Sequence, residues 1–237
     1  PEMRILALFD DAGQSVKNAL VEHDVVSVGL SNKPTVLQMD LSDLSSSKTI
    51  LAMHQEKSFD VIFASPPCES WSFATASRGG NAYRFSDNLK LKNFDEWQQN
   101  TFNNIRRMVE KGNPELPEKF MRYFDTGVNG EKTAFVTAQI IQKLNVPFVI
   151  ENPTSSMIWR YFEMLGLRFV HNKTNYCAYD KAFSAKPTTF ASNRVLNLKT
   201  GKAEVIMKNL KGRGDGSERA NIPKDLIIDI AKQIQAA

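Results

Sequence analysis

The stretch that decides the fold is "RILALFDDAGQSVKNALVEHDVVSVGL", residues 4–30. It opens with the apolar run 4–9, which is typical of a buried strand, and then passes through a turn at 10–13. Residues 14–23 repeat their apolar side chains with helical spacing, and 25–30 is a second apolar strand. A strand, a turn, a helix and a second strand in this order predict a βαβ unit within a parallel sheet.

The same alternation continues along the chain. Further strands are predicted at 35–41, 60–65, 147–153 and 167–172, and helices at 45–56, 94–111, 133–144, 156–165 and 224–234. A hairpin is expected at 195–198 and 203–207, whereas the stretch around 185–193 is typical of a loop. We therefore expect an α/β protein built of βαβ units around a parallel sheet.

Composition sets the broad class of the protein. The 237 residues are 42% hydrophobic and 24% charged, which is ordinary for a globular chain with one sizeable core. No apolar run approaches the roughly 20 residues of a membrane span, and no signal peptide is evident. The two cysteines, Cys68 and Cys177, have neither a disulfide framework nor zinc-ligand spacing, so we expect no metal and a reducing cytoplasmic setting.

The charge of the chain is unevenly placed. The net charge is +4, yet residues 168–219 hold eleven Lys or Arg against four Asp or Glu. Such a segment suits a polyanion such as nucleic acid. A solvated lysine-rich surface explains the same charge equally well, so charge alone leaves both interpretations open.

Two strand ends carry reactive side chains. In "FDVIFASPPCESWS", residues 59–72, two prolines stop the strand and leave Cys68 on a stiff loop. In "PFVIENP", residues 147–153, another strand ends in Glu151 and Asn152. In a doubly wound sheet such ends line one crevice. A thiolate and a proton-donating carboxyl group suit attack on an electron-poor heterocycle such as cytosine, with addition at C6, protonation at N3 and capture of an electrophile at C5.

These residues resemble a known family. "SPPCESWS" and "ENP" are similar to the Pro-Cys and Glu-Asn signatures of the DNA cytosine-5 methyltransferases, in the family's order. "LALFDDAG" and "QMDL" resemble its S-adenosylmethionine-binding segments, and "GEKTAFVTAQII" and "GSERANIPKDLIIDIAKQI" resemble later motifs. The resemblance spans nearly the whole chain and is closest to short phage or prokaryotic members, some of which serve restriction–modification. It implies the class I, Rossmann-like methyltransferase fold, with a seven-stranded, mostly parallel sheet and helices on both faces. It also implies a single catalytic domain, 1–237.

The resemblance also implies roles for individual residues. Cys68 would bond to C6 of a cytosine flipped out of double-stranded DNA, Glu151 would stabilise the N3-protonated intermediate, and Asn152 would fix the loops. Residues implied for the S-adenosylmethionine pocket are Phe9, Asp10, Ala12, Gly13, Asp40, Leu41, Ser65 and Pro66. The loop after Cys68, with Ser70, Ser72 and Arg78, would close over the base, and Trp71 could stack on the base or equally anchor the loop. Lys181 and Lys186 are alternatives for replacing a basic contact to the cytosine that this chain lacks.

The chain departs from the family pattern in four places. Asp10 and Asp11 replace small residues in the cofactor turn, and Gly29 stands where an acid usually holds the ribose. The Gln-x-Arg-x-Arg segment is replaced by "NYCAYD", and an insertion at about 73–130 and a basic segment at about 176–219 take the place of a full target-recognition domain. Two alternatives follow: a DNA-binding relative without turnover, and a cytosine-modifying enzyme that uses an altered S-adenosylmethionine-type cofactor.

Overall fold

The computed structural model of the chain describes residues 1–72, 94–112, 116–201 and 221–237. The chain divides into two compact units. The sheet unit comprises Pro1–Pro66, Val136–Thr154 and Leu167–Ala237. The helical unit comprises Pro67–Phe135 and Ser155–Gly166, and therefore takes in most of the predicted 73–130 insertion.

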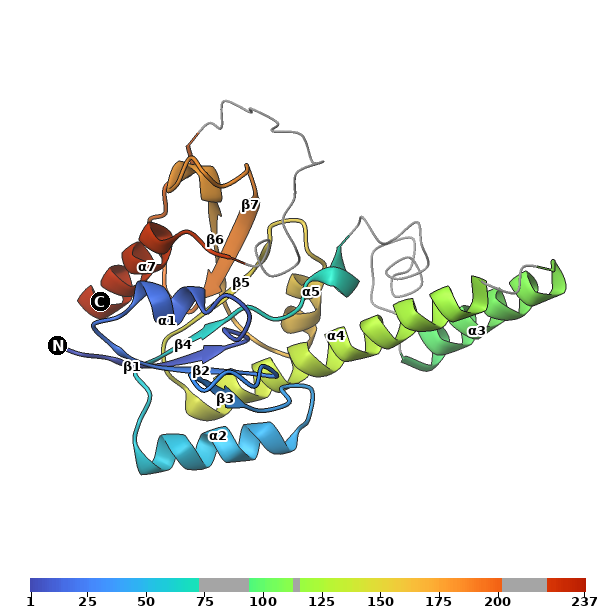
Figure 1. Cartoon of the computed structure of the whole chain (residues 1–237), viewed down its shortest axis with the longest axis horizontal. Helices are drawn as coiled ribbons and strands as arrows, with labels where there is room; N and C mark the ends of the chain where they lie inside the picture. Colours follow the sequence, from blue (N-terminus) through green and yellow to red (C-terminus); the bar gives the residue numbers. More distant parts are fainter. Residues whose placement is uncertain (73–93, 113–115, 202–220) are drawn as a thin grey trace. The chain divides into compact units, whose positions relative to one another are not determined.

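The sheet unit is built on a single mixed sheet. Within the described part of the chain, seven strands pair in the order β3-β2-β1-β4-β5-β7-β6 (Figure 1). Strands β1 to β5 pair parallel with one another, whereas β7 is antiparallel to both β5 and β6. The strands are β1 (Arg4–Leu8), β2 (Asp24–Gly29), β3 (Val36–Gln38), β4 (Val61–Ala64), β5 (Phe148–Pro153), β6 (Val170–Asn175) and β7 (Pro187–Ser192). This is the predicted α/β, Rossmann-like architecture with a seven-stranded, mostly parallel sheet.

Helices cover both faces of this sheet. Alternate side chains of a strand point to opposite faces, so Ile5 and Ala7 of β1 pack with α1 (Ser15–Ala19) and α7 (Lys224–Ala236) in one core cluster. On the other face lie α2 (Ser45–Glu56) and the last residues of α4 (Leu116–Leu144) (Figure 1). Lys143 of α4 donates to Ser47 Oγ of α2 at 3.4 Å.

The helical unit contains η1 (Glu69–Trp71), α3 (Phe94–Glu110), residues 116–135 of α4 and α5 (Ile158–Met164). Its core includes Trp71, which is fully buried and whose ring centroid lies 5.1 Å from that of Tyr161. The backbone N–H of Met157 donates to the Trp71 carbonyl at 3.0 Å, so the loop that carries Trp71 is bound to the start of α5.

Three elements differ from the sequence-based expectation. The stretch predicted as a loop around 185–193 contains β7, whose residues after Pro187 are all buried. The helix expected from 133 begins at Leu116, so the 133–144 pattern is only its last part. The helix expected over 14–23 is confined to Ser15–Ala19. Residues 195–198 form no strand, and 203–207, their predicted partner, lie outside the described residues.

No described helix combines the length and the apolar composition needed to cross a membrane.

Candidate active site

The turn after β1 is held by an inward-facing carboxylate. Phe9 adopts a left-handed backbone, with φ of 63°, and its N–H donates to the Val28 carbonyl at 2.9 Å. Asp10 then accepts hydrogen bonds from the Val16 N–H at 2.9 Å, the Lys17 N–H at 3.1 Å and the Ser27 hydroxyl at 2.8 Å. Burial raises the pKa of Asp10, and these hydrogen bonds partly oppose that shift. Both carboxylate oxygens of Asp10 therefore accept hydrogen bonds from residues of α1 and β2.

The C-terminal segment closes over this turn. A Cβ on Gly13 would lie 2.1 Å from Asn221 Oδ1, so a side chain at position 13 would require the Asn221 side chain to shift. The Ile222 N–H donates to Ser15 Oγ at 3.1 Å. The start of the closing segment thus packs on the turn, although Ala12 and Gly13 keep exposed surface.

A second acid lies at the end of β2. The Oδ2 atom of Asp11 accepts hydrogen bonds from the N–H groups of Leu30 at 2.9 Å and Ser31 at 3.1 Å. A Cβ on Gly29 would lie only 2.2 Å from Asp11 Cγ. The sequence marks Asp11 only as a departure from the family pattern, because its position beside Gly29 depends on the pairing of β1 with β2.

The end of β3 carries the predicted Asp40 and Leu41. Asp40 is exposed, and its Oδ1 accepts hydrogen bonds from the Ser42 N–H at 2.9 Å and the Ser42 hydroxyl at 2.6 Å. Leu41 is buried. Asp40 therefore offers a carboxylate to solvent, and Leu41 packs inward.

The side-chain amide of Asn152 connects the ends of β4 and β5 by a hydrogen bond. Ser65 continues β4 and donates its N–H to the Leu8 carbonyl at 3.2 Å. Asn152, which is 1% exposed, donates from Nδ2 to the Pro66 carbonyl at 2.9 Å and to the Glu151 carbonyl at 3.1 Å. The Asn152 side chain thus fixes the first proline of the Pro-Pro-Cys loop against β5.

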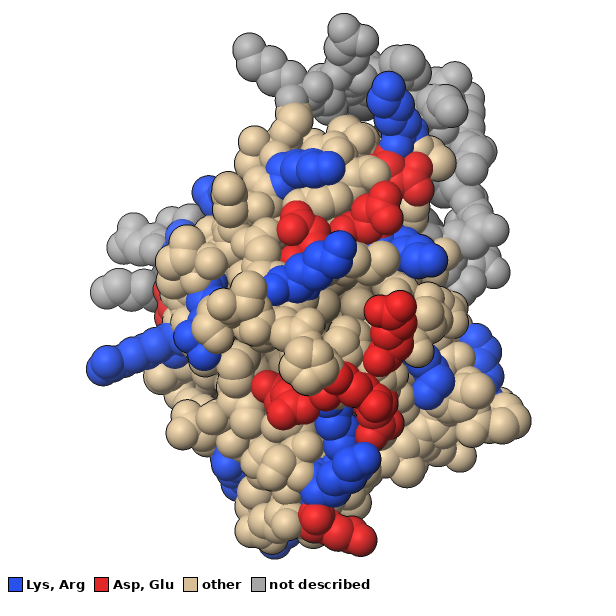
Figure 2. All heavy atoms as spheres, turned by 90° about the vertical axis from the view of Figure 1, so that its left-hand side faces the viewer, with Lys and Arg blue, Asp and Glu red and all other residues tan. Residues whose placement is uncertain are grey.

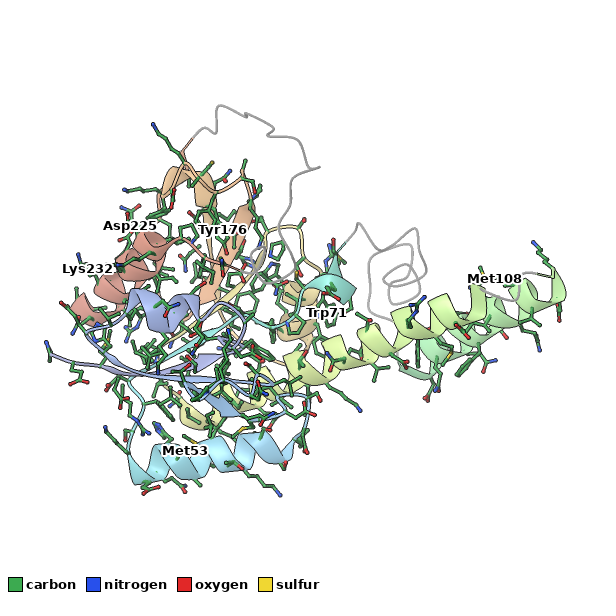
Figure 3. All side chains as sticks on the ribbon, viewed as in Figure 1. Met53, Trp71, Met108, Tyr176, Asp225 and Lys232 are labelled. Atoms are coloured by element: carbon green, nitrogen blue, oxygen red, sulfur yellow. The ribbon has the colours of Figure 1, made fainter. Side chains whose placement is uncertain are left out.

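The Glu151 carboxylate lies beside one hydrogen-bond donor and one cation. Its side chain is 12% exposed, and its Oε1 accepts a hydrogen bond from the Tyr176 hydroxyl at 3.1 Å. The Lys186 ammonium lies 3.7 Å from the same oxygen and 5.1 Å from the centroid of the Tyr176 ring. Tyr176, in η3 (Tyr176–Ala178), lies in the core of the sheet unit (Figure 3). No sequence signal pointed to Tyr176.

The predicted residues beyond Pro66 belong mainly to the helical unit. Cys68 and Ser72 are partly exposed, and Ser70 is buried beside Gly130. The complete burial of Trp71 favours its role as a loop anchor over its role as a base-stacking surface, because a base cannot reach it there. Arg78 lies outside the described residues, and Lys181 of the sheet unit is exposed.

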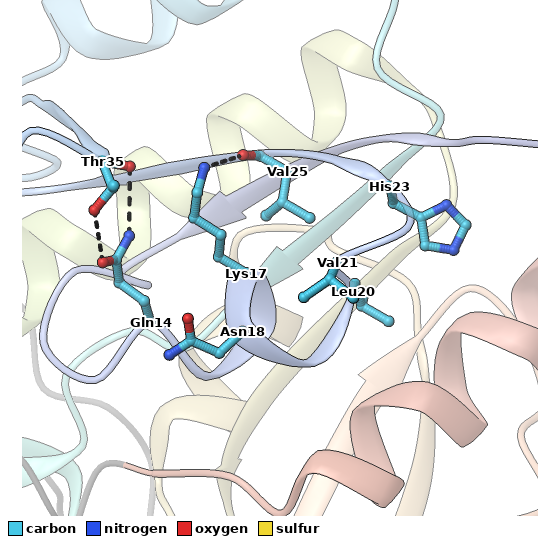
Figure 4. A pocket seen from close by; sticks show the side chains of 8 residues that line it. All are labelled: Gln14, Lys17, Asn18, Leu20, Val21, His23, Val25 and Thr35. Carbon is cyan, nitrogen blue, oxygen red and sulfur yellow. Dashed lines mark hydrogen bonds between the residues drawn. The ribbon is translucent and has the colours of Figure 1, made fainter.

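A pocket of about 330 Å³ lies near the start of β2, at the end of the strand away from Gly29 (Figure 4). Its polar side chains bind the protein itself: Lys17 donates to the Val25 carbonyl at 2.9 Å, and Gln14 accepts a hydrogen bond from the Thr35 hydroxyl at 2.8 Å. The pocket is lined by Gln14, Lys17, Asn18, Leu20, Val21, His23, Val25 and Thr35. Since none of these residues bears the candidate chemistry, the pocket is not the candidate site.

Charge on the described surface is mixed on the face that Figure 2 shows. There Lys and Arg side chains are interspersed with Asp and Glu. That face does not show the uniform basic patch expected of a DNA-contacting surface. Among the described residues, no three His, Cys, Asp or Glu side chains form a group that could hold a metal ion.

Comparisons with known proteins found little. No family model matches the chain, and no curated protein matches it. The chain is structurally similar to a methyltransferase of Entamoeba histolytica, EhMeth, with a TM-score of 0.45 and 9% sequence identity. The match covers 85% of this chain but only 57% of that protein.

Proposed function

We propose that the protein transfers a methyl group from S-adenosylmethionine to C5 of a cytosine in double-stranded DNA, through a covalent bond between Cys68 and C6. The observation that carries the proposal is the hydrogen bond from Asn152 to the Pro66 carbonyl, at 2.9 Å. It ties the Pro-Pro-Cys loop to the strand that bears Glu151. If Asn152 had only a structural role, the presence of Tyr176 and Lys186 beside the adjacent Glu151 would be left without a reason.

Covalent connectivity adds to this support. Cys68 follows Pro66 by two residues, and successive Cα atoms are about 3.8 Å apart. The Cα atoms of Pro66 and Cys68 are therefore within about 8 Å of each other in any arrangement of the chain. The chain itself therefore limits how far the Cys68 backbone can lie from the residue that Asn152 binds.

The chemistry assigns one step to each group. The Cys68 thiolate adds to C6 of cytosine, while the Glu151 carboxyl group donates a proton to N3, so that the electron pair moves toward C5. Tyr176 and Lys186 hold the Glu151 side chain, and Lys186 supplies a cation for the carbonyl oxygen of the base. Once C5 carries the new methyl group, loss of the C5 proton to solvent expels the thiolate. Return of the N3 proton to Glu151 then gives the neutral aromatic ring and resets the acid.

The residues at the strand ends fit a nucleoside cofactor, which when bound supplies an electrophilic methyl group. Leu30 exposes an apolar side chain after β2, and the Asp40 carboxylate is exposed after β3. Phe9, Ser65 and Pro66 would complete the wall. Asp10 does not fit the role of holding the methionine amine, because its oxygens are engaged by α1 and Ser27.

Trapping on DNA that contains 5-fluorocytosine tests the proposal. Fluorine at C5 cannot leave as a proton does, so the methylated adduct persists and migrates as a denaturation-resistant complex. We expect the complex to need S-adenosylmethionine and to vanish in Cys68→Ala. The matched control is Cys177→Ala, which removes the other cysteine and should retain the complex. An adduct that persists in Cys68→Ala would refute the assignment.

The second candidate, a DNA-binding relative without turnover, is favoured by the engaged Asp10 and by Asn221 packed over Gly13. Calorimetry with S-adenosylmethionine separates the two. Absence of binding at millimolar cofactor, together with retained DNA affinity, would select this candidate.

A further inference from the structure

The end of β2 is shaped around a side chain from another strand. Gly29 is buried, and a Cβ there would lie 2.2 Å from Cγ, 2.5 Å from Cβ and 2.5 Å from Oδ2 of Asp11. Contacts this short are not compatible with any side chain at position 29 while Asp11 stays in place. Gly29 therefore makes room for Asp11, and the carboxylate of the β1 turn occupies the end of β2.

The Asp11 carboxylate is oriented by only one of its oxygens. Oδ2 accepts the N–H groups of Leu30 at 2.9 Å and Ser31 at 3.1 Å, which fixes the plane of the group. Oδ1 has no hydrogen-bond partner among the residues that the structure describes. A carboxylate held by one oxygen and open at the other is a positioned acceptor for a hydroxyl donor.

An apolar surface lies next to this acceptor. Leu30 is 66% exposed, although it directly follows a buried strand. Its backbone is held on both sides, because its N–H donates to Asp11 and its carbonyl accepts a hydrogen bond from Gln38 Nε2 at 3.2 Å. An exposed leucine beside an open carboxylate matches the two halves of a nucleoside, a flat ring and a sugar bearing hydroxyl groups.

We propose that Asp11 accepts hydrogen bonds from the ribose hydroxyls of the nucleoside cofactor, with Leu30 against its ring, so that Asp11 supplies from β1 the acid that β2 lacks. The inference rests on the proposed function, since it concerns the cofactor of the same site. It makes Asp11 and Gly29 a compensating pair: the glycine is required because the acid comes from the neighbouring strand.

Calorimetry with S-adenosylhomocysteine and its 2′-deoxy analogue tests the inference without any turnover. The wild-type protein should bind the ribose form about tenfold to a hundredfold more tightly than the deoxy form. Asp11→Asn should weaken binding of the ribose form and abolish most of this preference. The control Glu22→Gln, an exposed acid before β2, should leave both affinities unchanged.

A variant pair separates ligand contact from loop support. Gly29→Asp alone should lose binding, because the new side chain collides with Asp11. The double variant Asp11→Gly with Gly29→Asp should regain affinity and the ribose preference. If Asp11→Asn weakens both ligands equally, Asp11 only supports the loop and the inference is overturned.

The same measurements distinguish this failure from failure of the proposed function. Wild-type protein that binds the cofactor and forms the 5-fluorocytosine adduct, but shows no ribose preference, overturns only the role of Asp11. Wild-type protein that binds neither ligand overturns both proposals.

Discussion

The ammonium of Lys186 lies 3.7 Å from Oε1 of Glu151, although 35 residues separate them in the chain. The pairing of β5 with β7 explains this contact. Because β7 is antiparallel, its first residues pair with the last residues of β5, and Pro153 is registered with Thr188. Lys186, which immediately precedes β7, therefore meets the strand end that bears Glu151.

Lys186→Ala should lower the rate of methyl transfer to DNA by about tenfold or more, since charge-assisted contacts of this kind are typically worth that much. Lys186→Arg should retain part of the rate because it keeps the charge. Lys173→Ala, which removes an exposed lysine on β6, is the control. Transfer of tritiated methyl groups to unmethylated DNA measures the rate, and a wild-type rate in Lys186→Ala would contradict the role of Lys186.

Glu151→Gln should lower the turnover rate by about a hundredfold or more, because an amide cannot donate the proton that N3 needs. DNA affinity should change little, since the side chain keeps its size and loses only its charge. Fluorescence anisotropy with labelled duplex DNA measures the affinity. Tyr176→Phe, which keeps the carboxyl group and removes one donor to it, should cost less turnover; a fully active Glu151→Gln protein would refute the role of Glu151.

Asn152→Ala should lower the free energy of unfolding by about 1–3 kcal/mol, because the buried Pro66 carbonyl loses its 2.9 Å hydrogen bond. Asn152→Asp should cost at least as much, since it removes both donors and buries a charge. Urea denaturation measures both, with the exposed Asn32→Ala as control. Equal stability of Asn152→Ala and the wild type would show that Asn152 does not anchor the loop.

The stability of the protein should depend on pH through Asp10. Burial raises the pKa of this carboxyl group above its ordinary value of 3.8, so the folded chain binds the proton more tightly than the unfolded chain. The resulting stabilisation is fully present below pH 3.8 and is lost as the pH rises through the folded pKa.

Comparison with Asp10→Asn isolates this effect. The free energy of unfolding of the wild type, relative to Asp10→Asn, should increase as the pH falls from 7.5 toward 3.8. For Asp43→Asn the same difference should not increase, because the hydrogen bond from the Ser45 N–H lowers the pKa of Asp43 below 3.8. A flat difference for Asp10→Asn as well would show that its carboxyl group does not titrate in this range.

Elements with strong local patterns could be predicted from the sequence. The helix expected at 45–56 is observed as Ser45–Glu56, and the strand expected at 60–65 is observed as Val61–Ala64. Both have hydrophobic spacing that determines their type without reference to the rest of the chain. The α/β class and the parallel part of the sheet followed from the repetition of such units.

Elements determined by distant partners could not be predicted. The strand Pro187–Ser192 contains a proline and two threonines and has no local period, yet it is buried between β5 and β6. Only that long-range pairing makes it a strand. The same limit applied to the site: the sequence left Lys181 and Lys186 as alternatives, whereas the antiparallel direction of β7 brings Lys186 to Glu151.

The insertion of β7 between β5 and β6 also has a consequence for synthesis of the chain. As the ribosome releases the protein, β5 emerges first and β6 second, but the two strands are not neighbours in the folded sheet. The outer hydrogen-bonding edge of β5 therefore stays uncovered until Ser192 has been translated. A nascent chain that stalls before Ser192 is translated exposes the unpaired hydrogen-bonding edge of β5. The chain would depend most on a chaperone at this stage of synthesis.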